Sequence, residues 1–159
     1  MTKSLTIKPE ALYAFFKPFK YLVFAFILFF VGMFLSQFLN NKLVFQIAIG
    51  VTGVFLLIYV YNYLFIRSIS YIINKEQIKF KRGIFTIKED FIELYRVKDQ
   101  AVKRPFIMRF INAMQLSLET SDKSHPTFNF IGIKKTNLPN VIRELVEKIR
   151  EEKKVREFD

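Results

Sequence analysis

Few residues in this chain could carry out catalysis. There is no cysteine, and the single histidine, His125, precedes Pro126 in a polar turn. With no thiolate and one imidazole, the chain has no cysteine nucleophile and lacks the ligands of a structural zinc site. The five glycines are dispersed and do not form a phosphate-binding loop. The remaining candidates are carboxylates.

Three carboxylates, Glu89, Asp90 and Glu93, lie close together in the sequence. A pair of carboxylates can act as a general acid and a general base. Here they fall within an alternating pattern that is typical of a strand edge with solvated charges. No nucleophile stands beside a base. We therefore predict that the protein is not an enzyme, has no catalytic residue, and uses neither a metal nor another cofactor.

The basic residues predict binding. The net charge is +11, and residues 67–159 contribute +7 of it. Lys79 and Lys81 share one face of a predicted strand, where basic side chains would attract anionic lipid headgroups by about 1 kcal/mol each. The alternative is a solvated face that only helps to set membrane topology. The candidates for headgroup contact are Lys79, Lys81, Arg82, Arg67 and Lys75.

A second candidate surface is the apolar and basic run from Phe106 to Ile111. Such a run suits a loop that dips into a membrane or binds a protein partner. The alternative is a core strand or a short helix. The candidate partner-binding residues are Lys103, Arg104, Phe106, Ile107, Arg109 and Phe110.

Two long apolar segments precede these surfaces. Tyr21 to Asn41 and Leu43 to Ile66 are uncharged over 21 and 24 residues. About 20 helical residues cross the hydrocarbon core of a bilayer, and so small a chain could not cover two such helices. We predict a two-helix transmembrane hairpin over residues 21–66, after a cytoplasmic or interfacial segment over residues 1–20. Small residues, Gly32 among them, suit close helix packing.

The charges that flank these segments predict their orientation. Four lysines precede the first segment, and Arg67 with further basic residues follows the second, whereas the connection holds only Lys42. Basic flanks stay on the cytoplasmic side. We therefore expect a multi-pass protein of the inner (cytoplasmic) membrane with both termini in the cytoplasm.

After residue 66 the apolar pattern changes to a period of two, which predicts strands. A turn is expected at Arg82-Gly83. Near the C-terminus, apolar residues recur at helical spacing and predict an amphipathic helix over residues 138–157. The predicted strands cover residues 68–74, 77–81, 84–88, 91–95, 114–120 and 127–133.

These elements resemble those of a known family. The residues concerned are Tyr71-Ile72-Ile73 followed by Lys81-Arg82-Gly83, the segment 92–99, the run 104–114, and Glu119-Thr120-Ser121. In these stretches the chain resembles the bacterial pleckstrin-homology (PH)-like domain family, in its membrane-anchored type with two N-terminal transmembrane helices. The resemblance implies a small PH-like β-barrel or curved antiparallel sheet over residues 67–159, capped by the C-terminal α-helix. Where the family often has Gly-x-Gly, this chain has Asn112-Ala113-Met114.

Two classes of function fit this architecture. The first is a non-catalytic membrane-anchored module that binds a protein partner, another copy of itself, or anionic membrane lipids. Nucleic acid is not expected, because tethering favours lipid as the anionic partner. The second is a two-span membrane effector of the antiphage type, gated by a small ligand such as a nucleotide. A polar pocket inside the barrel would favour the effector, and a packed apolar barrel would favour the binding module. An accessory subunit of a larger membrane complex is a third interpretation.

Overall fold

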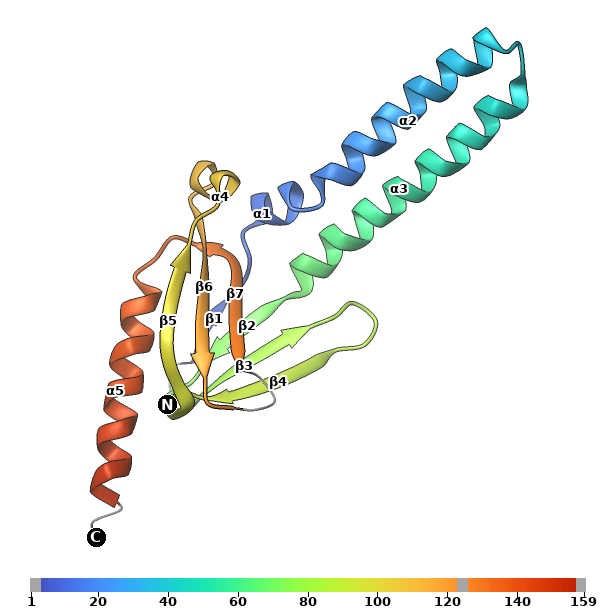
Figure 1. The fold of residues 1–159 in the computed structure, drawn as a ribbon. Helices are drawn as coiled ribbons and strands as arrows, with labels where there is room; N and C mark the ends of the chain where they lie inside the picture. Colours follow the sequence, from blue (N-terminus) through green and yellow to red (C-terminus); the bar gives the residue numbers. More distant parts are fainter. Residues whose placement is uncertain (1–3, 123–125, 157–159) are drawn as a thin grey trace. The chain divides into compact units, whose positions relative to one another are not determined.

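The computed structural model describes residues 4–122 and 126–156 and divides the chain into two compact units. One unit is Ala14–Ile66. The other joins Met1–Tyr13 to Arg67–Asp159. Figure 1 shows the first unit as paired helices and the second as strands with a C-terminal helix.

The helical unit is built from apolar sequence. It contains part of α1 (Ala11–Phe16), all of α2 (Phe19–Phe38) and most of α3 (Lys42–Ser68). The 20 residues of α2 rise about 30 Å, the thickness of a bilayer's hydrocarbon core. By length and composition, two helical segments could each cross a membrane. The first is Ala11–Phe38, which comprises α1 and α2, and the second is Lys42–Ser68, which is α3.

The two long helices approach closely at one glycine. A Cβ on Gly32 would overlap the Cβ of Ala48, so a larger residue at position 32 would force the helices apart. Phe24 and Phe55 meet along the same contact, with ring centroids 6.3 Å apart. Gly50, by contrast, has no neighbour within 4 Å of an added Cβ. Gly32 and Ala48 are therefore small residues that allow the two helices to pack closely.

The second unit holds two antiparallel sheets. The first has the order β1-β2-β3-β4 and the second the order β5-β6-β7. A single turn of 3-10 helix, η1 (Leu94–Arg96), connects them. A short helix, α4 (Phe106–Phe110), joins β5 to β6, and α5 (Leu138–Arg156) follows β7. The strands are β1 (Leu5–Ile7), β2 (Ser70–Ile73), β3 (Gln77–Arg82), β4 (Lys88–Glu93), β5 (Val97–Lys103), β6 (Ala113–Thr120) and β7 (Thr127–Lys134).

Most of these elements match the prediction from the sequence, and two regions differ. The predicted strand over residues 84–88 is wrong, because residues 83–87 form a turn and Arg82 pairs with Lys88 across it. Strands β1 and β5 were not predicted. Strand β1 is three residues long, and β5 lies at a sheet edge where most of its side chains are exposed, so neither has a clear alternating pattern.

Aromatic side chains fill the space between the sheets. Tyr71 of β2 is fully buried, and its ring lies 4.7 Å from that of Phe130 on β7. Phe80 and Phe128 meet edge to face at 5.4 Å. The Tyr71 hydroxyl accepts a hydrogen bond from the Ile131 N–H at 2.9 Å and lies 3.3 Å from the Asn129 carbonyl oxygen, to which it donates. One phenol thus links the two sheets.

The helical hairpin is an insertion between two neighbouring strands. Strand β1 pairs with β2 although residues 8–69 separate them in sequence. Directly after β1, the Glu10 N–H donates to the Gly132 carbonyl at 2.8 Å. Tyr13 is buried against Gly132. The β-sheet unit is therefore tied to both ends of the inserted segment, and the chain before the first apolar helix is part of its fold.

Candidate functional site

The basic residues of β3 form ion pairs with the neighbouring strand. Lys79 and Lys81 project from the same face of β3, as the alternation predicted. Their ammonium groups lie 2.5 and 2.7 Å from the carboxylate of Glu89. Arg82 lies 3.3 Å from Asp90. Two of the three carboxylates noted in the sequence, Glu89 and Asp90, are therefore the partners of the proposed headgroup contacts, whereas Glu93 pairs with Arg96.

These pairs alter the electrostatics of the strand. Hydrogen bonds from Lys79 and Lys81 hold the pKa of Glu89 below its ordinary value, and the bond to Glu89 raises the pKa of Lys81. Both pKa shifts favour the charged forms of Lys81 and Glu89. Partly exposed pairs of this kind add little stability. Their main effect is that Glu89 and Asp90 cancel part of the positive potential that would attract headgroups.

The five predicted headgroup residues do not form one cluster. Lys79, Lys81 and Arg82 lie along β3. Arg67 lies in the last turn of α3, close to the Arg82 end of β3, because Ser68 bonds to Gly83. Lys75 lies in the connection between β2 and β3, at the opposite end of β3. A lipid site would therefore involve Arg67 and β3, without Lys75.

The predicted partner surface is a short helix with exposed aromatic rings. Met108 anchors α4 in the core, while Phe106 and Phe110 are 72% and 76% exposed. Their rings pack edge to face with centroids 4.8 Å apart. The Arg109 side chain donates to the Arg104 carbonyl at 3.3 Å and so braces the helix. The sequence left open whether this segment is an exposed loop or a core strand or short helix. It is a short helix, and its aromatic side chains face the solvent.

A further exposed apolar site is not predicted from the sequence, in which its residues resemble a strand. The turn between β3 and β4 exposes Phe85 and Ile87 by 91% and 67%. Gly83 has φ +123°, and any side chain there would overlap the Thr86 carbonyl, so this turn depends on glycine. The sequence signal for this turn is Gly83 itself. A glycine at this point ends β3, so the apolar residues that follow it are left outside the strand.

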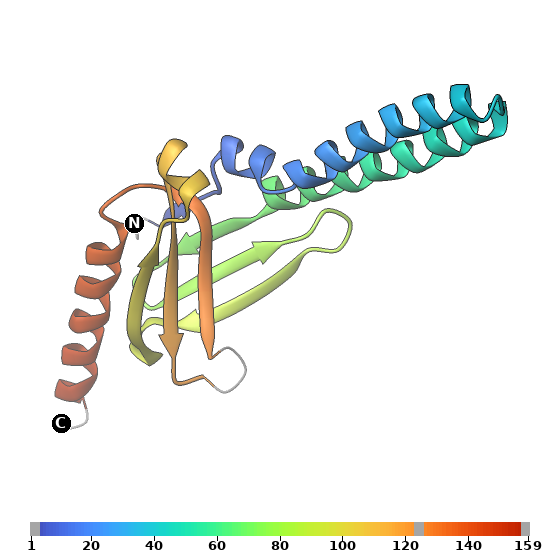
Figure 2. The ribbon, with the colours of Figure 1, turned by 45° about the horizontal axis from the view of Figure 1, so that its top comes forward.

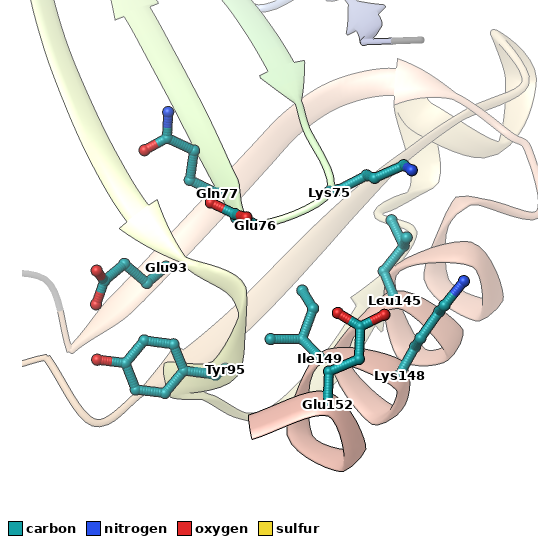
Figure 3. Close-up of a pocket in the computed structure, with 9 residues that line it drawn as sticks. All are labelled: Lys75, Glu76, Gln77, Glu93, Tyr95, Leu145, Lys148, Ile149 and Glu152. Atoms are coloured by element: carbon teal, nitrogen blue, oxygen red, sulfur yellow. The ribbon is translucent and has the colours of Figure 1, made fainter. Parts of the chain in front are cut away.

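Two hollows lie beside α5, one of about 380 Å³ and one of about 460 Å³. Figure 3 shows the first, between α5 on one side and the β2–β3 connection with the end of β4 on the other. Glu76, Glu93 and Glu152 contribute carboxylates to it, against Lys75 and Lys148. Because Glu93 is also paired with Arg96, the lining is close to neutral and offers no net positive charge to an anionic ligand such as a nucleotide.

The interior of the sheets likewise gives no support to the ligand-gated effector. A polar pocket inside the barrel would have favoured that hypothesis. Tyr71, Phe80, Phe128 and Phe130 occupy this space with their rings in mutual contact. A packed apolar interior is the feature that we expected of a binding module.

Residues 4–122 and 126–156 contain no group of three or more His, Cys, Asp and Glu residues that could hold a metal ion. His125 lies outside these residues. Within the described part of the β-sheet unit, the most exposed large apolar side chains are Phe85 and Ile87 in the turn after β3 and Phe106 and Phe110 on α4.

Comparison with known proteins gives one result. A family model described as "Bacterial PH domain" matches residues 23–153. The match begins inside α2 and ends in α5, so it includes most of the helical hairpin as well as β2 to β7. No curated protein and no solved structure matches the chain significantly.

Proposed function

The chain belongs to the bacterial PH domain family, and from this premise we propose that it is a non-catalytic binding module anchored in the inner membrane. The module would bind its ligand at the cytoplasmic face. A PH fold does not itself specify a ligand, so the proposal must rest on a surface of this chain. The observation that carries it is α4, with its exposed aromatic pair and adjoining basic residues.

The orientation of the anchor follows from charge. Lysines precede α2, Arg67 ends α3, and Lys42 alone marks the connection. By the positive-inside rule, both termini lie in the cytoplasm. A reporter fused to the C-terminus should be active only as a cytoplasmic reporter, and an epitope inserted beside Lys42 should be reached only from outside. A periplasmic C-terminus would contradict the proposed topology.

Two ligand classes suit the α4 segment. A protein partner is the leading candidate, because exposed aromatic and arginine side chains held on a rigid element are typical of interface hot spots. Anionic lipid headgroups are the second candidate. Lys103, Arg104 and Arg109 give residues 103–111 a charge of +3 with no acidic residue among them, whereas β3 is partly neutralised by β4.

Replacing both Phe106 and Phe110 by serine should remove the partner. Each hot-spot aromatic is worth about 2 kcal/mol or more, so each loss weakens binding by about 30-fold. The measurement is purification of the full chain in mild detergent from its native host, followed by identification of proteins and lipids that co-elute with wild type and not with the variant. Because Met108 still anchors α4, the fold should be preserved.

The control is Phe91→Ser, which removes a half-exposed phenylalanine from another element, β4. A protein partner should be lost from the α4 variant and retained by the Phe91 variant. Loss of anionic lipid alone would favour the second ligand class. If the α4 variant keeps every companion of the wild type, α4 is not the binding surface.

A further inference from the structure

The turn that joins β3 to β4 presents apolar side chains where a water-soluble hairpin would have polar ones. Phe85 and Ile87 lie in this five-residue turn, 91% and 67% exposed. Figures 1 and 2 show β3 and β4 running out from the rest of the sheets to this turn. Large apolar side chains so exposed and only two positions apart mark a surface that a protein partner or a membrane covers.

The position of the turn indicates that a membrane covers it. The Gly83 N–H donates to the hydroxyl of Ser68, the last residue of α3, at 3.2 Å. The uncharged segment of α3 ends at Ile66, two residues earlier. Two residues span at most about 7 Å. The interfacial layer on each side of the hydrocarbon core is itself about 5–8 Å thick. The hydrogen bond therefore holds the turn within reach of the layer where α3 leaves the bilayer.

The charges around the turn also suit a membrane interface. Arg82 and Lys88 face each other in the last pair of β3 and β4, directly below the apolar tip. The first acidic residue, Glu89, comes one pair further from the tip. An apolar tip with basic residues at its base is the arrangement in which aromatic groups enter the headgroup layer and cations contact anionic lipid.

We propose that the turn Gly83–Ile87 inserts Phe85 and Ile87 into the interface of the bilayer that α2 and α3 cross. This inference rests on the membrane anchoring proposed above and adds a third attachment to the two covalent connections. Because the turn is at one end of β3, its insertion sets which face of the β-sheet unit points toward the lipid. The opposite end of β3, beside the carboxylate-lined hollow, then points away from it.

Tryptophan fluorescence can test the depth of this turn, because the chain contains no tryptophan. The full chain carrying Phe85→Trp is reconstituted into vesicles of phosphatidylcholine and phosphatidylglycerol, with or without bromine on both the upper and the lower parts of the acyl chains, so that tryptophan is quenched at the interface and at the bilayer centre alike. Insertion predicts a blue-shifted emission relative to the same protein in denaturant, and loss of most of the emission in the brominated vesicles.

Two further single-tryptophan variants make the outcome decisive. Phe30→Trp, in the middle of α2, reports the anchor. Glu152→Trp, an exposed position beside the far end of β3, reports a site distant from the lipid. Quenching at positions 30 and 85 but not at 152 supports the proposal. Quenching at 30 without quenching at 85 overturns it and leaves the anchoring intact.

The remaining outcomes are equally informative. No quenching at position 30 contradicts the membrane anchoring, and the inference about the turn falls with it. Equal quenching at positions 85 and 152 shows that the β-sheet unit as a whole lies on the bilayer, which contradicts a specific role for the turn.

Discussion

Replacing Gly132 by alanine should destabilise the β-sheet unit by about 2.5–5 kcal/mol. Gly132 has φ +63°, a left-handed conformation that costs an alanine about 1–2 kcal/mol. A Cβ at this position would also overlap the ring of Tyr13, which is buried against it. Expelling that ring loses about 1.5–3 kcal/mol of buried apolar surface. The two effects add because one arises in the backbone and the other in the packing.

The measurement is thermal unfolding of the full chain in detergent. The near-ultraviolet circular dichroism of the tyrosines monitors the transition. A loss of this size in a unit of about 100 residues should lower the midpoint by more than about 10 °C. The matched experiment introduces Gly132→Ala into a Tyr13→Ala background, where only the backbone cost of about 1–2 kcal/mol should remain. Equal losses in the two backgrounds would show that the ring contact is unimportant.

This junction has a consequence for experiments on the β-sheet unit alone. A fragment that begins at residue 67 lacks β1, Glu10 and Tyr13. It would leave the outer edge of β2 unpaired and the surface over Gly132 uncovered. Exposed strand edges of this kind promote aggregation. The membrane and partner tests above therefore use the full chain.

The parts of the fold that could be predicted from sequence are those with a local pattern. The apolar helices are recognisable because charged residues mark both ends of each one. One face of each of the other predictable elements is buried, which gives their sequences a regular apolar pattern; these elements are β2, β3, β6, β7 and α5. Strand β1 could not be predicted, since its partner lies across a 62-residue insertion. Nor could β5, whose exposed side chains leave almost no alternation.

The candidate surfaces divide in the same way. The residue types at Phe106 and Phe110 identified α4 as unusual, but only the burial of Met108 shows which face is exposed. The pairing of Lys79 and Lys81 with Glu89 depends on strand register, which residue types do not reveal. Phe85 was assigned to a strand because apolar residues near a glycine fit a strand as well as a turn.

Tyr71→Phe should cost about 1–3 kcal/mol at neutral pH, since it leaves the Ile131 N–H without its partner in the interior. The ring remains, so the aromatic packing is unchanged and the loss reports the hydroxyl. Urea unfolding of the full chain in detergent measures it. Tyr95→Phe is the control, because it removes a phenol hydroxyl that accepts a hydrogen bond from its neighbour Arg96 outside the sheet interior.

The same substitution should also change the response to alkaline pH. Burial raises the pKa of Tyr71 to about 12, so the folded protein keeps the phenol protonated while the unfolded chain loses that proton near pH 10. The stability contributed by the neutral phenol is complete below pH 10 and falls by up to about 1.4 kcal/mol for each pH unit between 10 and 12. Phenylalanine cannot ionise. The stability difference between wild type and Tyr71→Phe should therefore narrow from pH 9 to pH 11.5, and an unchanged difference would show that the phenol is not buried in this way.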